Sequence, residues 1–131
     1  MESRNELSKY RLEEAYRCLQ AANALVAVND YKSAANRSYY CVFNAMKSIL
    51  ALEAVDFKHH SAVISHFRKN YVKTGIFDTK MSDIPGELFT VRGKSDYMDF
   101  YVISKEQVSE QIESAEYFLG QIHKYHDEQR K

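Results

Sequence analysis

The scarcity of helix-breaking residues is the feature that most limits what this chain can fold into. Its 131 residues include a single proline, Pro85, and four glycines. Both residue types destabilise the interior of a helix, and the long stretches between them favour helix formers. The alternation of apolar and polar residues that marks strands is weak. We therefore predict an all-α protein, and the length fits one domain over residues 1–131.

Apolar residues recur at helical spacing in the first part of the chain. One helix is expected over about residues 6–28, and a second over residues 31–52. Asn29 and Asp30 lie between them, and such residues end one helix and cap the next. The apolar stripe of the second helix contains Tyr31, Ala35, Tyr39, Val42, Met46, Ile49 and Leu50.

The remaining helices are predicted from shorter signals. One is expected over about residues 61–69 and another within residues 80–94, where Pro85 should lie near the first turn and its missing N–H costs little. Ser104 and Gln107 form a capping box that should open the last helix. Together these segments predict an up-and-down bundle of four to five helices.

Charge and composition exclude several classes of protein. The chain has 18 basic and 18 acidic residues, so any phosphate contact must come from local placement rather than bulk charge. Its two cysteines, Cys18 and Cys41, are too few for a disulfide framework or a four-cysteine zinc site, and we expect no metal and no cofactor. Without a signal-peptide pattern or an apolar run of roughly 20 residues, a cytoplasmic protein without membrane contact is expected.

The second predicted helix also has a face away from its apolar stripe. Arg37 and Asn44 are seven residues apart, which places them two turns, or roughly 10.5 Å, apart along one side. This side could be a solvated face, a ligand site or a dimer seam. Asparagine is unfavourable in the middle of a helix, so Asn44 calls for a reason, and Cys41 and Tyr40 make the side partly apolar. The expected strip contains Arg37, Cys41, Asn44 and Ser48, with Tyr40 and Lys47 beside it.

Three blocks occur in order along the chain, NRSYYCVFNAMKSIL, KHHSAVISHFRKNYVKTGIFD and ELFTVRGKSDYMDFY. They resemble the HEPN superfamily of small nucleotide-binding domains, and in particular its single-domain bacterial and archaeal members, over about residues 5–125. The resemblance implies a helical bundle, a homodimer, and a small nucleotidyltransferase of the MNT type as partner in a toxin–antitoxin-like system. It also implies a relation to metal-independent ribonucleases, which are frequent in the superfamily.

The motif of this superfamily is an arginine followed, after four to six residues, by a histidine. Arg37 fits the arginine, but the histidine position, after six intervening residues, is Asn44. An imidazole exchanges protons near neutral pH, whereas an amide only donates and accepts hydrogen bonds. The resemblance therefore favours binding of a nucleotide or RNA over its cleavage. The alternative is a metal-independent ribonuclease that uses Arg37 with Asn44 or His60.

The remaining candidates have alternative interpretations. Tyr40 borders the strip and could stack on a base or pack at a helix or dimer seam. His60 aligns with a histidine that is frequent in the superfamily, and it could serve as an acid–base group or only as a cap or loop hydrogen bond. In the third block, an acidic residue could form a structural ion pair or orient Arg37. The expected ligand-binding residues are Arg37, Tyr40, Cys41, Asn44 and His60, and the expected supporting residues are Arg92, Asp96 and Asp99.

Overall fold

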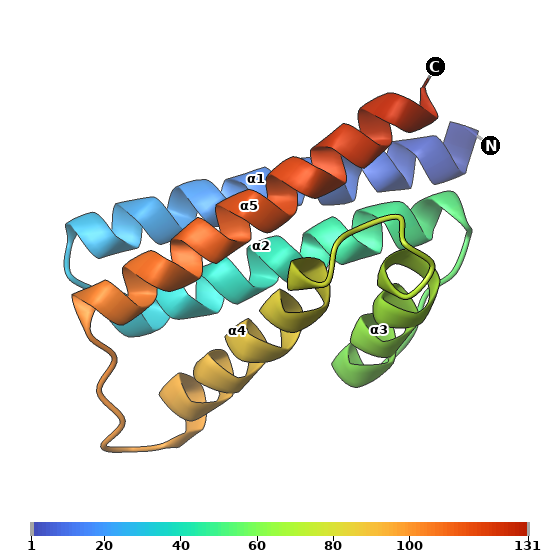
Figure 1. The fold of residues 1–131 in the computed structure, drawn as a ribbon. Coiled ribbons are helices and arrows are strands. Elements are labelled where there is room, and N and C mark those ends of the chain that lie inside the picture. The colour runs from blue at the N-terminus through green and yellow to red at the C-terminus, as the bar shows by residue number, and fades with distance from the viewer. Residues whose placement is uncertain (1, 131) are drawn as a thin grey trace.

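The computed structural model describes residues 2–130 and shows a bundle of five α-helices (Figure 1). No strand occurs in that range, so the prediction of an all-α bundle is confirmed. The helices are α1 (Glu2–Ala27), α2 (Tyr31–Leu52), α3 (His60–Phe67), α4 (Lys80–Tyr97) and α5 (Lys105–Gln129), and a short π-helix, η1 (Arg68–Val72), continues α3.

The central element of the bundle is α2. It contacts α1, α5, α4 and α3. In Figure 1 the long helices α1, α2 and α5 run side by side, and α3 and α4 lie on the other side of α2. Both ends of the chain lie at the same end of the bundle. Since neighbours surround α2 on most of its circumference, only a narrow part of its surface is left open.

The turn between α1 and α2 forms as predicted. α1 ends at Ala27, and Asn29 has a positive φ of 62°, which asparagine tolerates better than most residues. The Asp30 carboxylate caps α2 by accepting a hydrogen bond from the Ser33 N–H at 3.3 Å. The bounds of α2 match the prediction, whereas α1 begins at Glu2 rather than at about residue 6.

The segment after α3 is more regular than expected. α3 passes into η1, where the Lys73 N–H donates to the Arg68 carbonyl oxygen at 2.8 Å, the i→i+5 spacing of a π-helix. The chain then turns at Gly75, whose φ of 88° lies in the left-handed region that favours glycine. Because α4 begins at Lys80, Pro85 lies in its second turn, and the expectation of a first-turn proline is wrong.

Pro85 weakens the hydrogen bonding of α4 without ending the helix. Because proline has no N–H, the Met81 carbonyl oxygen loses its helical donor. The Arg68 side chain supports this part of α4 from outside, since its Nε donates to the Ser82 carbonyl oxygen at 2.8 Å. A Cβ added at Gly86 would lie 2.6 Å from Arg68 Nη2. Glycine at this position therefore gives the guanidinium room to hold α4 against η1.

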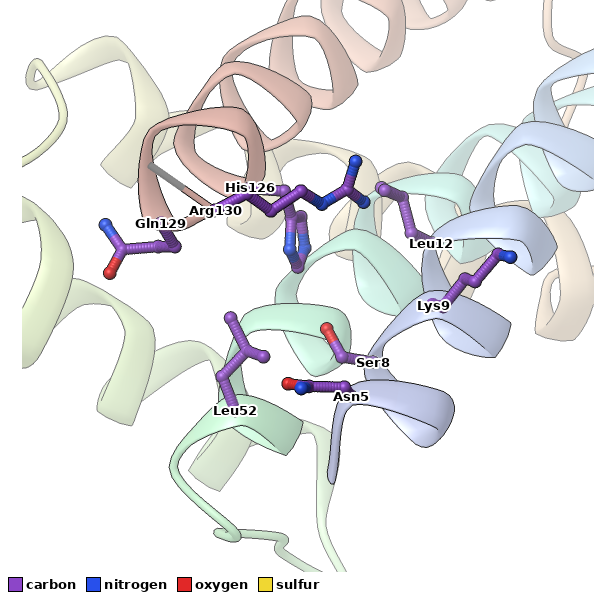
Figure 2. A pocket seen from close by; sticks show the side chains of 8 residues that line it. All are labelled: Asn5, Ser8, Lys9, Leu12, Leu52, His126, Gln129 and Arg130. Carbon is purple, nitrogen blue, oxygen red and sulfur yellow. The ribbon is translucent and has the colours of Figure 1, made fainter. Parts of the chain in front are cut away.

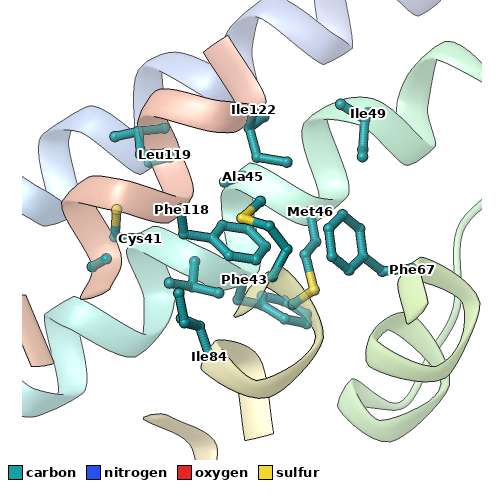
Figure 3. Packing of buried hydrophobic residues seen from close by; sticks show 14 of the residues in the cluster. Cys41, Phe43, Ala45, Met46, Ile49, Phe67, Ile84, Phe118, Leu119 and Ile122 are labelled. Atoms are coloured by element: carbon teal, nitrogen blue, oxygen red, sulfur yellow. The ribbon is translucent and has the colours of Figure 1, made fainter. Parts of the chain in front are cut away.

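The hydrophobic core lies around the inward side of α2. Figure 3 shows side chains of α2, α3, α4 and α5 meeting there, with Met46, Phe67 and Phe118 close to its centre. All three are fully buried. The predicted apolar stripe of α2 is buried except for Tyr31, which is half-buried. Large apolar side chains at helical spacing thus supply the interior that holds the five helices together.

The last helix begins at the predicted capping box. The Ser104 hydroxyl accepts a hydrogen bond from the Gln107 N–H at 3.0 Å, and Gln107 Oε1 accepts one from the Ser104 N–H at 2.9 Å. α4 extends to Tyr97, so the irregular connection before α5 is shorter than expected. Over residues 2–130, no helix has both the length and the apolar character to cross a membrane.

Candidate functional site

One narrow face of α2 remains partly open to solvent. Half-buried side chains recur there every three or four residues, the spacing that places residues on one side of a helix. Three of the predicted ligand-binding residues, Arg37, Tyr40 and Asn44, lie on this face. We call it the open strip, and it consists of Ser33, Asn36, Arg37, Tyr40, Asn44 and Lys47.

Cys41 and Ser48 lie outside the open strip, which corrects the prediction for both. Each is completely buried, because α1 and α5 cover this side of α2. Ser48 Oγ hydrogen-bonds to His126 Nε2 of α5 at 2.8 Å, and the Ser8 hydroxyl of α1 donates to the Ser48 carbonyl oxygen at 2.6 Å. Figure 2 shows Ser8 and His126 in the wall of a cavity of about 480 Å³. Burial raises the pKa of the Cys41 thiol, and a thiol without solvent access cannot contact a ligand.

A chain of polar contacts holds Arg37 and reaches α4. Arg37 Nε and Nη2 both donate to Asn36 Oδ1, at 3.1 and 2.7 Å. Asn36 Nδ2 donates to Asp96 Oδ2 at 3.4 Å, and the same oxygen accepts from Arg92 Nε at 3.1 Å. Asp96 therefore forms an ion pair with Arg92 and reaches Arg37 only through Asn36. One carboxylate thus helps to orient both guanidinium groups.

The ring of Tyr40 interacts with both arginines. The guanidinium carbon of Arg37 is 5.2 Å from the ring centroid, and that of Arg92 is 5.4 Å from it. At such distances an aromatic face attracts a cation. Arg37 Nη1 and both Nη atoms of Arg92 have no hydrogen-bond partner within residues 2–130. Free guanidinium donors are suited to a phosphate, and both arginines keep such donors beside this ring.

A pocket of about 490 Å³ lies beside Arg37, between α2 and α4. Asn36, Arg37 and Asp96 are in its wall, and so is Ser95. The Ser95 residue is only 4% exposed, and its buried hydroxyl has no hydrogen-bond partner among the described residues. Buried hydroxyls in proteins nearly always have a partner. The Ser95 hydroxyl is therefore an unsatisfied polar group in the packing beside Arg37, beneath the wall of the pocket.

His60 approaches the open strip from the start of α3. Its Nδ1 is 2.7 Å from the Tyr39 hydroxyl, and its ring stacks on Phe43 with 4.1 Å between centroids. The ring centroid is 6.0 Å from that of Tyr40. Burial lowers the pKa of His60, and the charge of Arg92 acts in the same direction. The imidazole is therefore neutral at neutral pH and can accept a proton there.

Asn44 lies further along the strip and has different neighbours from Arg37. Its Nδ2 donates to the Tyr40 carbonyl oxygen at 2.9 Å, which is a contact within α2. It also lines a small pocket of about 230 Å³ with Arg11 and Glu14 of α1. Arg37 and Asn44 thus share one face, but Arg37 is oriented toward α4 and Asn44 toward α1.

The structure separates Asp99 from the strip. Asp99 is exposed in the connection after α4 and makes no hydrogen bond or ion pair within the described chain, so it does not support Arg37 and the prediction for it is corrected. It lines a different pocket, beside the turn between α1 and α2. His59 is exposed as well. No group of three or more His, Cys, Asp or Glu side chains within residues 2–130 is arranged to hold a metal ion.

Comparison with known proteins supports the family that the sequence resembles. The HEPN domain family matches residues 8–125. This chain belongs to the HEPN domain family. A "UPF0332 protein" of Thermotoga maritima is 30% identical over 124 residues, which is 95% of this chain and 94% of the relative. A Methanocaldococcus jannaschii protein named "Putative toxin MJ0142" is 30% identical over 122 residues, which is 93% of this chain and 82% of that protein.

The resemblance placed the motif at Arg37 and Asn44, and both residues lie on the open strip. The imidazole of His60, contributed by α3, lies near this face. The structure brings Arg37, Tyr40, Arg92, Asp96 and His60 together on one side of the bundle.

Two residues of the site were not predicted. Asn36 connects Arg37 to Asp96, and its position four residues before Tyr40 on the same helix face was a usable signal. Ser95 lines the pocket beside Arg37, and its burial depends on how α4 packs against α2. No pattern in the sequence indicates that packing.

Proposed function

We propose that this HEPN-domain protein binds a nucleotide or an RNA strand through the open strip of α2, with the pair Arg37 and Arg92 holding a phosphate. The observation that carries the proposal is the arrangement of two guanidinium groups, with free donors, about the ring of Tyr40. The adjoining pocket, which Asn36, Arg37 and Asp96 line, supports it. A phosphate would accept from the arginines, and a base would stack on the ring.

The chemistry of the motif positions favours binding over cleavage. Asn44 cannot take up or release a proton near neutral pH. Loss of a positioned acid–base group typically lowers a reaction rate about 10²–10⁴-fold. On this proposal the chain keeps the arginine of the superfamily motif, Arg37, and lacks the histidine that would transfer a proton.

Titration with AMP and with a short single-stranded RNA tests the binding function. We expect saturable binding that falls roughly tenfold to a hundredfold in Arg37→Ala, since a hydrogen bond to a charged group contributes about 1.5–3 kcal/mol. Lys124→Ala is the matched control, because it removes one exposed positive charge on α5. Equal losses in both variants would mean that only overall charge matters, and an absence of binding to either ligand would refute the proposal.

His60 supports a second candidate function, that of a metal-independent ribonuclease. Its neutral imidazole lies against the same face as Tyr40 and is near Arg92, so it could act as general base in place of the motif histidine. RNA cleavage in the presence of EDTA, abolished by His60→Gln, would establish this function. If wild type is inactive and Asn44→His gains activity, the binding function stands and Asn44 accounts for the lost cleavage.

The biological context that we propose is a toxin–antitoxin-like system, with a homodimer and a small nucleotidyltransferase as partner. The name of the Methanocaldococcus jannaschii relative supports the toxin part. Light scattering of the purified protein tests the homodimer, and co-expression with a nucleotidyltransferase encoded beside the gene tests the partner. A monomer that does not co-purify with such a protein would refute this context and leave the ligand site to be judged separately.

A further inference from the structure

A second cationic group adjoins the open strip, near its other end. Lys47, on the strip, and Arg11, on α1, both face the carboxylate of Asp56 in the loop after α2. Lys47 Nζ is 3.1 Å from Asp56 Oδ1, and Arg11 Nη2 is 3.8 Å from Oδ2. Burial alone would raise the pKa of Asp56, but this pKa lies below its ordinary value. Hydrogen bonds from Lys47 and from the Phe57 N–H lower it, and the charges of Lys47 and Arg11 lower it further. An anion is therefore stabilised between these two cations.

The position between Lys47 and Arg11 is incompletely satisfied by Asp56. The 3.8 Å contact to Arg11 is too long for a hydrogen bond. Arg11 Nε is buried and has no acceptor within residues 2–130, although a buried donor without a partner is costly. The Asp56 side chain is 60% exposed, whereas those of Lys47 and Arg11 are only 16% and 21% exposed. Two partly buried cations thus share one exposed carboxylate.

The two cationic groups are too far apart for one phosphate. Lys47 follows Arg37 by ten residues, which corresponds to roughly 15 Å along α2. Tyr40 and Asn44 lie between them on the strip, and Asn44 lines the small pocket with Arg11. Glu14 lines that pocket too, but its carboxylate pairs with Arg17 at 2.8 Å. The face between the groups is therefore partly aromatic and amide-bearing.

We propose that Arg11 and Lys47 form a second phosphate subsite, and that the ligand of this face is a single-stranded oligonucleotide several nucleotides long. This inference rests on the proposed function and makes it more specific. One phosphate lies at Arg37 and Arg92, a base stacks on Tyr40, and a later phosphate displaces Asp56 from Arg11 and Lys47. At 3.4 Å per stacked nucleotide, about five nucleotides span the two subsites, and fewer do so if the strand is extended.

A length series of oligoadenylates from one to eight nucleotides tests this subsite. We expect affinity to rise at least tenfold once the chain spans about five nucleotides, because hydrogen bonds to a second charged phosphate are added. The variant Arg11→Gln, which changes a residue on α1 outside the open strip, should lose much of this gain and bind AMP as wild type does. Its plot of log affinity against log salt should be less steep by about 0.7 for each phosphate contact that is lost.

Asp56→Asn provides a test with the opposite sign. It removes the internal competitor, so the longer oligoadenylates should bind several-fold more tightly while AMP binding stays unchanged. Misfolding would lower the affinity for the oligonucleotide, so it cannot produce such a gain. If affinity does not depend on length, and Asp56→Asn has no effect, the second subsite is refuted while AMP binding through Arg37 leaves the proposed function intact. If no oligoadenylate or AMP binds, both proposals fail.

Discussion

Two polar clusters on α2 are built in opposite ways. At Ser48, the Ser8 hydroxyl of α1 donates to the Ser48 main-chain carbonyl oxygen, and the Ser48 hydroxyl hydrogen-bonds to His126 of α5 beneath the surface. At Arg37 and Tyr40, charged side chains lie half-exposed and keep donors without partners. The first cluster satisfies its own polar groups and stabilises the packing of three helices. The second leaves hydrogen-bonding capacity unused, which marks it as the place to look for a ligand.

The difference between the two clusters arises from their neighbours. Ser48 and Asn44 are four residues apart on one helix, so sequence periodicity placed them on the same strip. The close packing of α1 and α5 covers Ser48 and Cys41 completely, while Asn44 stays half-buried. A polar residue on a helix therefore identifies a functional face only when the neighbouring helices are known.

Aspartate substitutions at Cys41 and Asn44 should distinguish the covered side of α2 from the open strip. Their difference in the free energy of unfolding is the largest effect that we predict. Cys41→Asp puts a charge into the core, where an unpaired charge costs several kcal/mol, and we expect a loss of about 3–5 kcal/mol in the free energy of unfolding. Asn44→Asp, on the open strip, should cost at most about 1 kcal/mol, since a half-exposed carboxylate stays hydrated. Urea denaturation measures both, and equal losses would contradict the assigned orientation of α2.

The buried cluster should make stability depend on pH. Burial, with the charge of Arg130, lowers the pKa of His126 to about 4, whereas in the unfolded chain histidine has a pKa of about 6.5. Between these values the unfolded chain binds more protons, so stability is complete above pH 6.5 and falls by up to roughly 3 kcal/mol as the pH approaches 4. Urea denaturation at several pH values should show this fall in wild type and in His59→Gln, an exposed control.

His126→Gln is the variant that isolates this contribution. It should be less stable than wild type at pH 7, because it loses buried contacts, but its stability should change less between pH 6.5 and 4. If its pH dependence equals that of wild type, another group is responsible and the assignment to His126 is wrong.

The contact from Asn36 to Arg37 should have a smaller effect, on binding alone. Asn36→Ala frees the Arg37 guanidinium from its acceptor and from the link to Asp96, and we expect AMP affinity to fall about fivefold, the effect of one hydrogen bond of about 1 kcal/mol. Thermal stability should stay within about 0.5 kcal/mol of wild type. Asn23→Ala, which removes an exposed asparagine of α1, is the control. Unchanged affinity in Asn36→Ala would show that Arg37 does not need this support.

Much of the fold could be predicted from local signals. Asp30 and the Ser104–Gln107 capping box mark helix starts through hydrogen bonds to residues three positions away, and such contacts are readable from the sequence. The second-turn position of Pro85 depends on the start of α4 and was missed. The early start of α1 and the extension of α4 to Tyr97 were also missed, since helix ends are set by weak and distant contacts.

The candidate site was less predictable than the fold. Arg37 and Tyr40 could be placed on one helix face by spacing, because both belong to α2. The approach of Arg92, Asp96 and His60 depends on how α4 and α3 dock against α2. Cys41 was placed on the wrong face because the sequence does not tell which sides of α2 the other helices cover.

Chemical-shift mapping by NMR tests the central claim most directly. A ¹⁵N-labelled sample is titrated with a single-stranded oligoadenylate of six nucleotides. We predict saturable shifts that concentrate at residues of the open strip and at Arg92 and Ser95, with no change at Ser8, Ser48 or His126. Shifts confined to the cavity at His126, or spread evenly over exposed lysines and arginines, would contradict the assignment of the ligand to the open strip.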